Sequence, residues 1–372
     1  MKLLHPSLGR RRGLAAGVLL AAAASLALSA CGGGGSAGSD GGSGGGGGGK
    51  TAVTLITKTS TNPFFLAMKK GAEDEAAKDG VTLTYAAGAE DGDEDGQIKA
   101  IEAAVARGDQ GILITVNGPG VNSAISQARK QGLYVIALDT PPDPADTVDL
   151  TIATNNFQAG EEIGKWAAAK QDGKPANIAM LDLYNDKVVS VDYGRDQGFL
   201  TGMGIDTKDA KKNGDEDKSG SYTGGKGGSY TIACNEPTQG AQDQGKSAME
   251  TCLSKTKDIN LVYTINEPAA AGAAEALKAA GVTATIVSVD GGCSPGIADV
   301  KAGIIGATAQ QYPVKMAQLG VQSIKTIADG GAKPANTAGL DFLDAGVALV
   351  TDKPVDGLES ITSDEGSKIC WG

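Results

Sequence analysis

The chain has 372 residues, with 33 Lys and Arg against 44 Asp and Glu and a net charge of −11. No cluster of basic residues stands out, so nucleic acid is not an expected partner, and the acidity mainly favours solubility. The only histidine, His5, lies in the N-terminal segment, so the rest of the chain excludes Ser–His–Asp and Cys–His catalysis and every histidine metal site. We therefore expect neither an enzyme nor a bound cofactor.

The first 30 residues are typical of a secretory signal. A stretch with three consecutive arginines precedes an apolar segment, residues 13–26, and small residues follow it. Leu28-Ser29-Ala30-Cys31 is similar to a lipobox, in which cleavage of the signal exposes a cysteine that is then acylated. We therefore predict a signal peptide over residues 1–30 and a lipid on Cys31, which would hold the protein outside the cytoplasm on the cell membrane.

Residues 31–50 are nearly all Gly, with a few Ser. Such a run cannot bury a core and behaves as a flexible coil, which predicts a tether between lipid and globule. From residue 51 onward, short β-branched runs alternate with Ala-rich segments of helical periodicity, and the chain is long enough for two domains. Asn62 and Pro63 are the residue types that begin a helix.

The expected elements follow in chain order. Strands are predicted at residues 52–57, 81–86, 111–116, 134–139, 151–154, 176–181, 230–233, 261–264 and 285–289, and helices at 63–78, 96–107, 121–131, 157–170, 188–202, 239–253 and 268–280. This alternation predicts an α/β fold, with parallel sheets covered by helices on both faces and repeated in two lobes. Residues 207–228 are polar, charged and Gly-rich, and are expected to form a solvated insertion.

Four cysteines follow Cys31, and an even number in an exported chain favours disulfides. Three pairings are possible. We favour Cys234 with Cys252, which closes a strand–helix unit, and Cys293 with Cys370, which would fix the C-terminus. Buried free thiols are the alternative.

Polar and aromatic residues gather where the predicted strands end, and ligands of open parallel sheets bind beyond those ends. Asp, Asn and Gln satisfy sugar hydroxyls, which both donate and accept, while an aromatic ring packs on the apolar face of a sugar. Capping of the following helices is the alternative explanation for each polar residue alone. The residues are Asn62, Phe64, Phe65, Asn117, Asp139, Asn156, Asn266, Asp290 and Gln310.

Several short motifs resemble the ribose-binding protein and its relatives, the solute-binding proteins of sugar importers. These motifs are Thr61-Asn62-Pro63-Phe64-Phe65, Ala106-Arg107-Gly108, Val289-Asp290-Gly291 and Ala309-Gln310. The resemblance covers about residues 51–350. It implies a type I periplasmic binding protein, with two Rossmann-like lobes joined by a hinge of three crossings. Residues 51–154 with 311–339 would form the N-terminal lobe, and 155–310 with 340–372 the C-terminal lobe.

Matched residue by residue, the resemblance implies sugar contacts from Asn62, Phe64, Phe65, Asn117, Asp139, Asn266, Asp290 and Gln310. The chain departs from the family at three places. Thr140 stands where an arginine follows the family's aspartate, and a second family arginine falls near Tyr193, with Arg195 two residues on. A family aromatic aligns with the glycine beside Gln239. Tyr193, Arg195 and Gln239 therefore join the candidates, and the lost arginines argue against ribose.

Residues 265–268 and 310–313 resemble the fructose-import binding lipoproteins of actinobacteria. The resemblance therefore implies a monomer that binds fructose, or a sugar such as ribose, xylose or mannose, and delivers it to the permease and ATPase of an ABC importer. A sugar or autoinducer sensor that feeds a signalling receptor would share the same fold and cleft. An exported glycosidase would need paired carboxylates, for which Asp139 and Asp290 are the candidates.

An acidic segment matches the spacing of a calcium-binding loop. Its residues are Asp91, Asp93, Asp95, Gly96 and Glu102. We favour a different interpretation, in which the carboxylates lie at the N-terminus of the following helix, where negative charge is stabilising.

Overall fold

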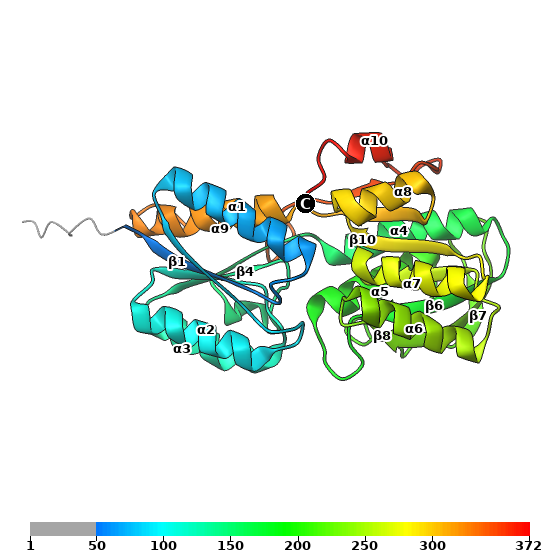
Figure 1. The fold of residues 1–372 in the computed structure, drawn as a ribbon, viewed down its shortest axis with the longest axis horizontal. Helices are drawn as coiled ribbons and strands as arrows, with labels where there is room; N and C mark the ends of the chain where they lie inside the picture. The colour runs from blue at the N-terminus through cyan, green and yellow to red at the C-terminus, as the bar shows by residue number, and fades with distance from the viewer. Residues whose placement is uncertain (1–49) are drawn as a thin grey trace, which may run out of the picture. The chain divides into compact units, whose positions relative to one another are not determined.

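The computed structural model describes residues 50–372, so the predicted signal peptide, Cys31 and nearly all of the predicted tether lie outside the described residues. Within residues 50–372, no helix combines the length and apolarity needed to cross a membrane. Two sheets of mostly parallel strands, each covered by helices, make up this part of the chain (Figure 1). The predicted α/β class with two lobes is confirmed.

The first lobe is built on a six-stranded sheet. Its elements are β1 (Ala52–Thr57), α1 (Pro63–Asp79), β2 (Thr82–Ala87), α2 (Glu94–Arg107), β3 (Gly111–Ile114), α3 (Asn122–Lys130), β4 (Tyr134–Leu138), β5 (Leu150–Ala153), α9 (Pro313–Ala328) and β12 (Leu343–Asp344). All strands are parallel, in the order β12-β5-β4-β3-β1-β2. Helices α1 and α9 cover one face and α2 and α3 the other (Figure 1). Since both faces are covered, every residue of β3 is buried.

Helix α1 shows how local chemistry sets an element of this lobe. The side-chain oxygen of Asn62 accepts the N–H of Phe64 at 2.9 Å, and Pro63 takes the first helical position. Gly80 ends the helix in the left-handed conformation, at φ 67°. The predicted helix start at Asn62 is therefore confirmed, and it places Phe64 and Phe65 directly after the end of β1.

The second lobe is built on a seven-stranded sheet. Its elements are α4 (Asn156–Gln171), β6 (Ala176–Asp182), α5 (Ser190–Met203), β7 (Ser219–Tyr222), β8 (Gly228–Pro237), α6 (Gln242–Lys255), β9 (Leu261–Thr264), α7 (Glu267–Ala280), β10 (Thr285–Asp290), α8 (Ala298–Ala302), β11 (Ile305–Gln310), β13 (Ala348–Val350) and α10 (Ser363–Gly366). The strand order is β13-β11-β10-β9-β6-β8-β7, with the two edge strands antiparallel. Helices α4 and α5 pack on one face, and α6 and α7 on the other.

The chain passes between the lobes three times, between β5 and α4, between β11 and α9, and between β12 and β13. Two expected boundaries need correction. The last crossing comes after Asp344 instead of residue 339, because Leu343 pairs with Ile152 of β5 in the first sheet. Residues 207–228 are not wholly a solvated insertion, because β7 pairs its backbone with the edge strand β8 and extends the second sheet.

The structure contains the two disulfides that the sequence favoured. Cys234 in β8 is joined to Cys252 in α6, which links the edge of the second sheet to a covering helix. Cys293, just after β10, is joined to Cys370, which lies two residues from the C-terminus. The second disulfide therefore fixes the end of the chain beside the loop that follows Asp290.

Candidate functional site

The end of β1 in the first lobe and the ends of β6, β9 and β10 in the second converge on one small cavity. A polar and charged group of side chains faces an aromatic pair across it, as a sugar requires. The cavity is lined by Lys58, Asn62, Phe64, Phe65, Asp91, Asp139, Leu183, Val191, Arg195, Ile265, Asn266, Asp290 and Gln311.

Seven of the predicted site residues share this cavity, and they come from both lobes. Phe64, Asp139 and Asp290, which lie far apart in the sequence, all line the same space. The full set is Asn62, Phe64, Phe65, Asp139, Arg195, Asn266 and Asp290.

Arg195 on α5 is the central cation of the cavity. Its side chain is almost fully buried, and its guanidinium lies 3.8 Å from Asp139 and 3.9 Å from Asp290. Three hydrogen bonds orient it, to the side chains of Asn156 (2.8 Å) and Gln311 (3.0 Å) and to the carbonyl of Ile265 (2.9 Å). The structure therefore places an arginine between the two aspartates.

The two aspartates have backbone conformations that L-residues seldom adopt, at φ 64° for Asp139 and 144° for Asp290. Such strain concentrates at functional sites, where the surrounding structure holds it in place. Burial raises the pKa of Asp290 well above its usual range; the charge of Arg195 opposes this shift, while Glu267 and Asp139 reinforce it. One side-chain oxygen of Asp139 has no hydrogen-bond partner in the described protein. The cavity thus presents buried acceptors that suit hydroxyl donors.

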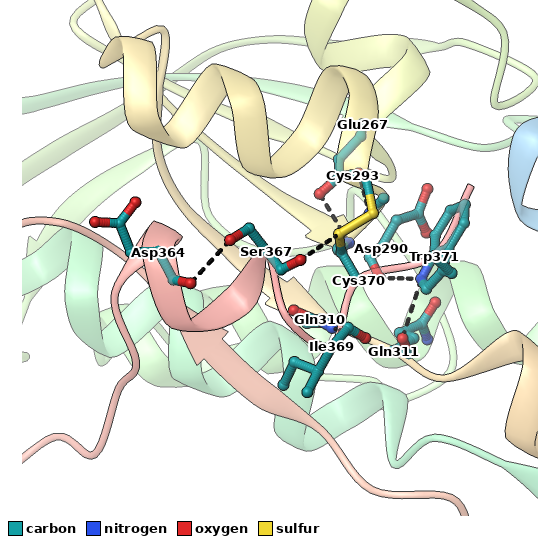
Figure 2. Close-up of a disulfide and its surroundings, with 12 residues drawn as sticks. Glu267, Asp290, Cys293, Gln310, Gln311, Asp364, Ser367, Ile369, Cys370 and Trp371 are labelled. Carbon is teal, nitrogen blue, oxygen red and sulfur yellow. Dashed lines mark hydrogen bonds between the residues drawn. A yellow bond between two sulfur atoms is a disulfide. The ribbon is translucent and has the colours of Figure 1, made fainter.

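The aromatic side of the cavity is reinforced by the end of the chain. Phe64 packs edge to face on Phe65, with ring centroids 5.5 Å apart, and on Trp371, at 5.3 Å. The indole N–H of Trp371 lies within hydrogen-bonding distance of the carbonyls of Asp290 (3.2 Å) and Gln311 (3.1 Å) (Figure 2). No pattern in the sequence predicts this contact, since Trp371 follows the last predicted element by many residues.

Glu267, the first residue of α7, holds the loop that follows Asp290. Its buried carboxylate accepts the N–H groups of Gly291 (2.8 Å) and Gly292 (2.9 Å) and the hydroxyl of Thr308 (2.8 Å). Burial raises the pKa of Glu267 to about 7, against the opposing effect of these hydrogen bonds. The position of Asp290 therefore depends on a carboxylate that does not line the cavity.

Five predicted residues do not line the cavity. Asn156 contacts it indirectly, by orienting Arg195. Asn117 instead supports the acidic loop, accepting from Gly92 and donating to the carbonyl of Asp93, and Gln310 donates to the carbonyl of Ile369 at 2.8 Å. The other two line neighbouring hollows, Tyr193 beside the start of α5 and Gln239 between the lobes.

Six lining residues were not among the predicted sugar contacts, and three of these are polar, namely Lys58, Asp91 and Gln311. Lys58 follows β1 and is 2% exposed, with its ammonium 3.8 Å from Asp91. A lysine directly after the buried strand β1 is the signal that could have pointed to it. Gln311 lines the cavity in place of its neighbour Gln310, because consecutive residues leaving a strand face opposite ways.

The acidic segment does not form a calcium loop. Asp93 caps α2 by accepting the N–H groups of Gly96 (2.9 Å) and Ala89 (2.8 Å), while Asp95 and Glu102 are exposed. Asp91 faces Lys58 and the second lobe instead. Within residues 50–372, no three Asp, Glu, His or Cys side chains are arranged to hold a metal ion. Asp93 lies at the N-terminus of α2, as the favoured interpretation predicted.

The loop after β6 contacts the first lobe directly. The hydroxyl of Tyr184 donates to Asp91, the ammonium of Lys187 to the carbonyl of Gly92 at 2.8 Å, and the hydroxyl of Ser190 to the carbonyl of Pro141. Burial raises the pKa of Tyr184, with the Asp91 carboxylate adding to the effect, so the phenol remains a donor. These bonds stabilise the contact between the lobes beside the cavity.

Removing one of these bonds should weaken ligand binding without removing a ligand contact. We expect Tyr184→Phe to raise the dissociation constant about 10-fold, because a hydrogen bond to a charged partner is worth about 1.5 kcal/mol. Tyr222→Phe is the matched control, since its buried hydroxyl donates to Lys174 within the second lobe. Calorimetric titration of both variants checks this, and equal affinities for the two would contradict it.

The cavity is small, with a volume of about 30 Å³, against about 300–1,000 Å³ for a typical ligand pocket. An adjoining hollow of about 490 Å³ shares Asn62 and Asp91 with it and is lined by both lobes. A monosaccharide therefore enters only if the lobes separate or the lining side chains move. A larger hollow of about 800 Å³ lies at the opposite edge of the first sheet, before β3 and β4, away from the strand ends where ligands of such sheets bind.

A second group of buried carboxylates lies outside the cavity, between α5 and the second sheet. Asp182 and Asp196 are fully buried, and Asp192 and Glu216 nearly so. Neither oxygen of Asp182 has a hydrogen-bond partner in the described protein. Burial raises the pKa of both Asp182 and Asp196 well above the usual range, and the charges of Asp192 and Glu216 add to the rise of both. Asp182 also raises the pKa of Asp196, whereas the side chain of Asp196 lowers that of Asp182. Asp192 rises less, to about 6, because the N–H groups of Leu183 and Tyr184 bind it.

Comparison with known proteins adds an independent observation. The family model described as periplasmic binding protein domain matches residues 53–332. The ribose import binding protein of Haemophilus influenzae is 26% identical, over 75% of this chain and 86% of its own length. The D-apiose import binding protein of Actinobacillus succinogenes is 28% identical, over 75% and 82%.

The fold is also similar to solved structures. An ABC transporter solute-binding protein from Agrobacterium vitis, bound with α-D-tagatopyranose, superposes with a TM-score of 0.69 at 20% identity, over 87% of this chain and 100% of that one. At this identity the similarity establishes the arrangement of the two lobes alone.

Proposed function

Because the chain belongs to the periplasmic binding protein family, we propose that it binds one monosaccharide between its two lobes and delivers it to the permease and ATPase of an ABC importer. The protein acts as a carrier and not as an enzyme. Relatives named as import binding proteins for ribose and apiose support a sugar as the class of ligand.

The cavity carries this proposal. Asp139 and Asp290 supply acceptors for hydroxyls, Asn62 and Asn266 supply amides that both donate and accept, and Phe64 with Phe65 supplies an apolar wall. Residues from both lobes contact the same space, so a bound sugar joins the lobes and stabilises their closed arrangement. That closed form is the one that docks on the permease.

Fructose is our first choice of sugar, with ribose, xylose and mannose as alternatives. The choice rests on residues 265–268 and 310–313, which include the lining residues Asn266 and Gln311. A keto sugar in its ring form presents a cluster of hydroxyls around the anomeric carbon, for which two aspartates flanking Arg195 offer acceptors and a donor.

A thermal-shift screen against fructose, ribose, xylose, mannose, galactose and inositol tests the proposal, followed by calorimetry on each sugar that shifts the melting temperature. We expect one of these monosaccharides to bind with a dissociation constant of about 1 μM or below, which corresponds to about 8 kcal/mol. No stabilisation by any sugar would contradict a sugar carrier. Release of a monosaccharide from an oligosaccharide during incubation with the protein would contradict it as well.

We further propose that a lipid on Cys31 holds the protein at the membrane. Cys31→Ala should leave sugar affinity unchanged, because the cavity lies wholly within residues 58–311, and should move the protein from the membrane fraction to the soluble exported fraction. Mass spectrometry of the mature N-terminus, together with fractionation of both forms, checks this. Membrane association that survives the substitution would refute the anchor.

A further inference from the structure

We propose that Trp371, next to the last residue of the chain, is a positioning residue of the sugar site, which the Cys293–Cys370 disulfide holds in place. The inference rests on the proposed function, since it concerns how the same cavity is kept in shape. Nothing in the family model reaches this segment, because the match ends at residue 332.

The C-terminal tail is attached to the loop after β10. The final residues of a chain are usually poorly ordered unless something ties them down. Here Cys370 is bonded to Cys293, and the N–H of Cys293 donates to the carbonyl of Trp371 at 2.8 Å (Figure 2). The backbone of Trp371 also bridges to Gly292 as a parallel strand would. Two links, the disulfide and the backbone pairing, thus join the tail to the loop after β10.

The indole of Trp371 lies in a buried position. Trp371 is 7% exposed, although it is one residue from the end of the chain. Its single N–H points at the carbonyls of Asp290 and Gln311, at 3.2 and 3.1 Å (Figure 2). Its ring packs edge to face against Phe64. A buried indole that satisfies its N–H in this way has one preferred orientation.

All three residues that the Trp371 side chain contacts line the cavity. Phe64 comes from the first lobe, Asp290 from the second, and Gln311 from the second crossing between them. Trp371 does not line the cavity itself, so it acts through these residues. It sets the angle of the Phe64 ring and, through the carbonyl of Asp290, holds the strained backbone of that residue, at φ 144°.

Two substitutions separate the roles of the ring and the N–H. Trp371→Phe keeps an aromatic edge against Phe64 but removes the donor, and we expect a 3- to 5-fold weaker sugar affinity. Trp371→Ala removes both, and we expect at least a 20-fold loss. The probe is the monosaccharide that binds the wild-type protein most tightly in the panel, titrated by calorimetry well below the melting temperature of each variant. Trp371→Phe should therefore recover part of the affinity that Trp371→Ala loses. A merely structural role would not produce this graded response.

Fluorescence supplies a second measurement. The chain has two tryptophans, and Trp166 is buried in the second lobe, where its N–H donates to the carbonyl of Lys353. Trp166→Phe therefore serves as the matched control for affinity and also leaves Trp371 as the sole reporter. We expect sugar to change the emission of Trp371 in this variant, because closure on the ligand alters the Phe64 ring against which the indole packs.

The two disulfides provide a matched pair of variants. Cys293→Ala with Cys370→Ala releases the tail and should weaken affinity at least 5-fold. Cys234→Ala with Cys252→Ala removes a bond between β8 and α6, away from the cavity, and should lower the melting temperature while affinity stays within 2-fold. Circular dichroism confirms that each variant is folded at the temperature of titration.

Failure of the positioning role can be told apart from failure of the proposed function. A wild-type protein that binds no sugar refutes the carrier. A wild-type protein that binds sugar, with Trp371→Ala within 2-fold of its affinity and no ligand-dependent emission from Trp371, overturns the positioning role. Equal loss of affinity from the two disulfide variants also overturns it, because the effect would then follow general stability.

Discussion

Asp290→Ala is expected to weaken sugar binding about 100-fold or more. The carboxylate of Asp290 lines the cavity and lies 3.9 Å from Arg195, so its loss removes an acceptor for hydroxyls and leaves a buried guanidinium with one charged neighbour fewer. A hydrogen bond to a charged group contributes about 1.5–3 kcal/mol, and a stranded buried charge costs more. Calorimetric titration with the sugar identified in the panel measures the change.

Asp290→Asn separates charge from shape, since it keeps the size of the side chain and one acceptor. We expect it to bind more tightly than Asp290→Ala and more weakly than the wild type. Asp109→Asn is the matched control, because Asp109 is a buried aspartate that pairs with Arg107 and Thr54 at the far edge of the first sheet. The site assignment would be wrong if Asp109→Asn and Asp290→Ala changed the affinity by similar factors.

Asp182→Asn should raise the stability of the folded protein at pH 8. Asp182 is fully buried beside Asp196, and neither of its side-chain oxygens has a hydrogen-bond partner in the described protein. Removing one negative charge from this group relieves a repulsion that burial makes strong. We expect a melting temperature about 2–4 °C higher at this pH, the shift that about 1 kcal/mol produces in a domain of about 150–250 residues.

The pH dependence of this gain follows from the direction of the shift. The pKa of Asp182 in the folded protein is raised above its ordinary value of 3.8, so the folded state binds the proton more tightly than the unfolded chain. Stability from this group is therefore greatest below pH 3.8 and is lost as the pH rises through the folded pKa. The variant should match the wild type near pH 4 and exceed it at pH 8.

Differential scanning calorimetry at pH 4, 6 and 8 measures the effect, with Asp217→Asn as the control because Asp217 is a largely exposed aspartate nearby. A lower melting temperature of Asp182→Asn at pH 8 would contradict the prediction. It would mean that the ionised carboxylate is stabilised in the folded protein, as a bound cation would do.

Much of the fold follows from local patterns along the chain. β9 has the predicted bounds, Leu261–Thr264, and the starts or ends of the other predicted elements differ by a few residues at most places. Buried β-branched runs and capped helices are decided by neighbours in the sequence, so a single sequence carries that information. No element was predicted beyond residue 289, so α8, β11, α9, β12, β13 and α10 were all missed. β7 was missed because Ser219–Tyr222 is Gly- and Ser-rich and becomes a strand only by pairing with β8.

The residues of the candidate site likewise fall into those that the sequence predicted and those that it did not. Asp139, Asn266 and Asp290 were predicted as site residues because each ends a strand, and in parallel sheets those ends meet at one edge. Lys58, Gln311 and the indole of Trp371 were not, because their roles depend on partners as distant as Asp91, Arg195 and Phe64.

From its order of residues alone, this chain predicts two wound sheets and the strand ends at which polar side chains gather, because these depend on repeating local chemistry. It favours one of three possible disulfide pairings without deciding between them. Only the tertiary structure determines three features of the site, because each depends on segments that are distant in the sequence. These features are the lining of the cavity by Gln311 instead of Gln310, the arginine between two aspartates, and the tryptophan that packs behind the aromatic wall. Their positions are set by which side chains share one enclosed volume, and no spacing along the chain encodes that volume.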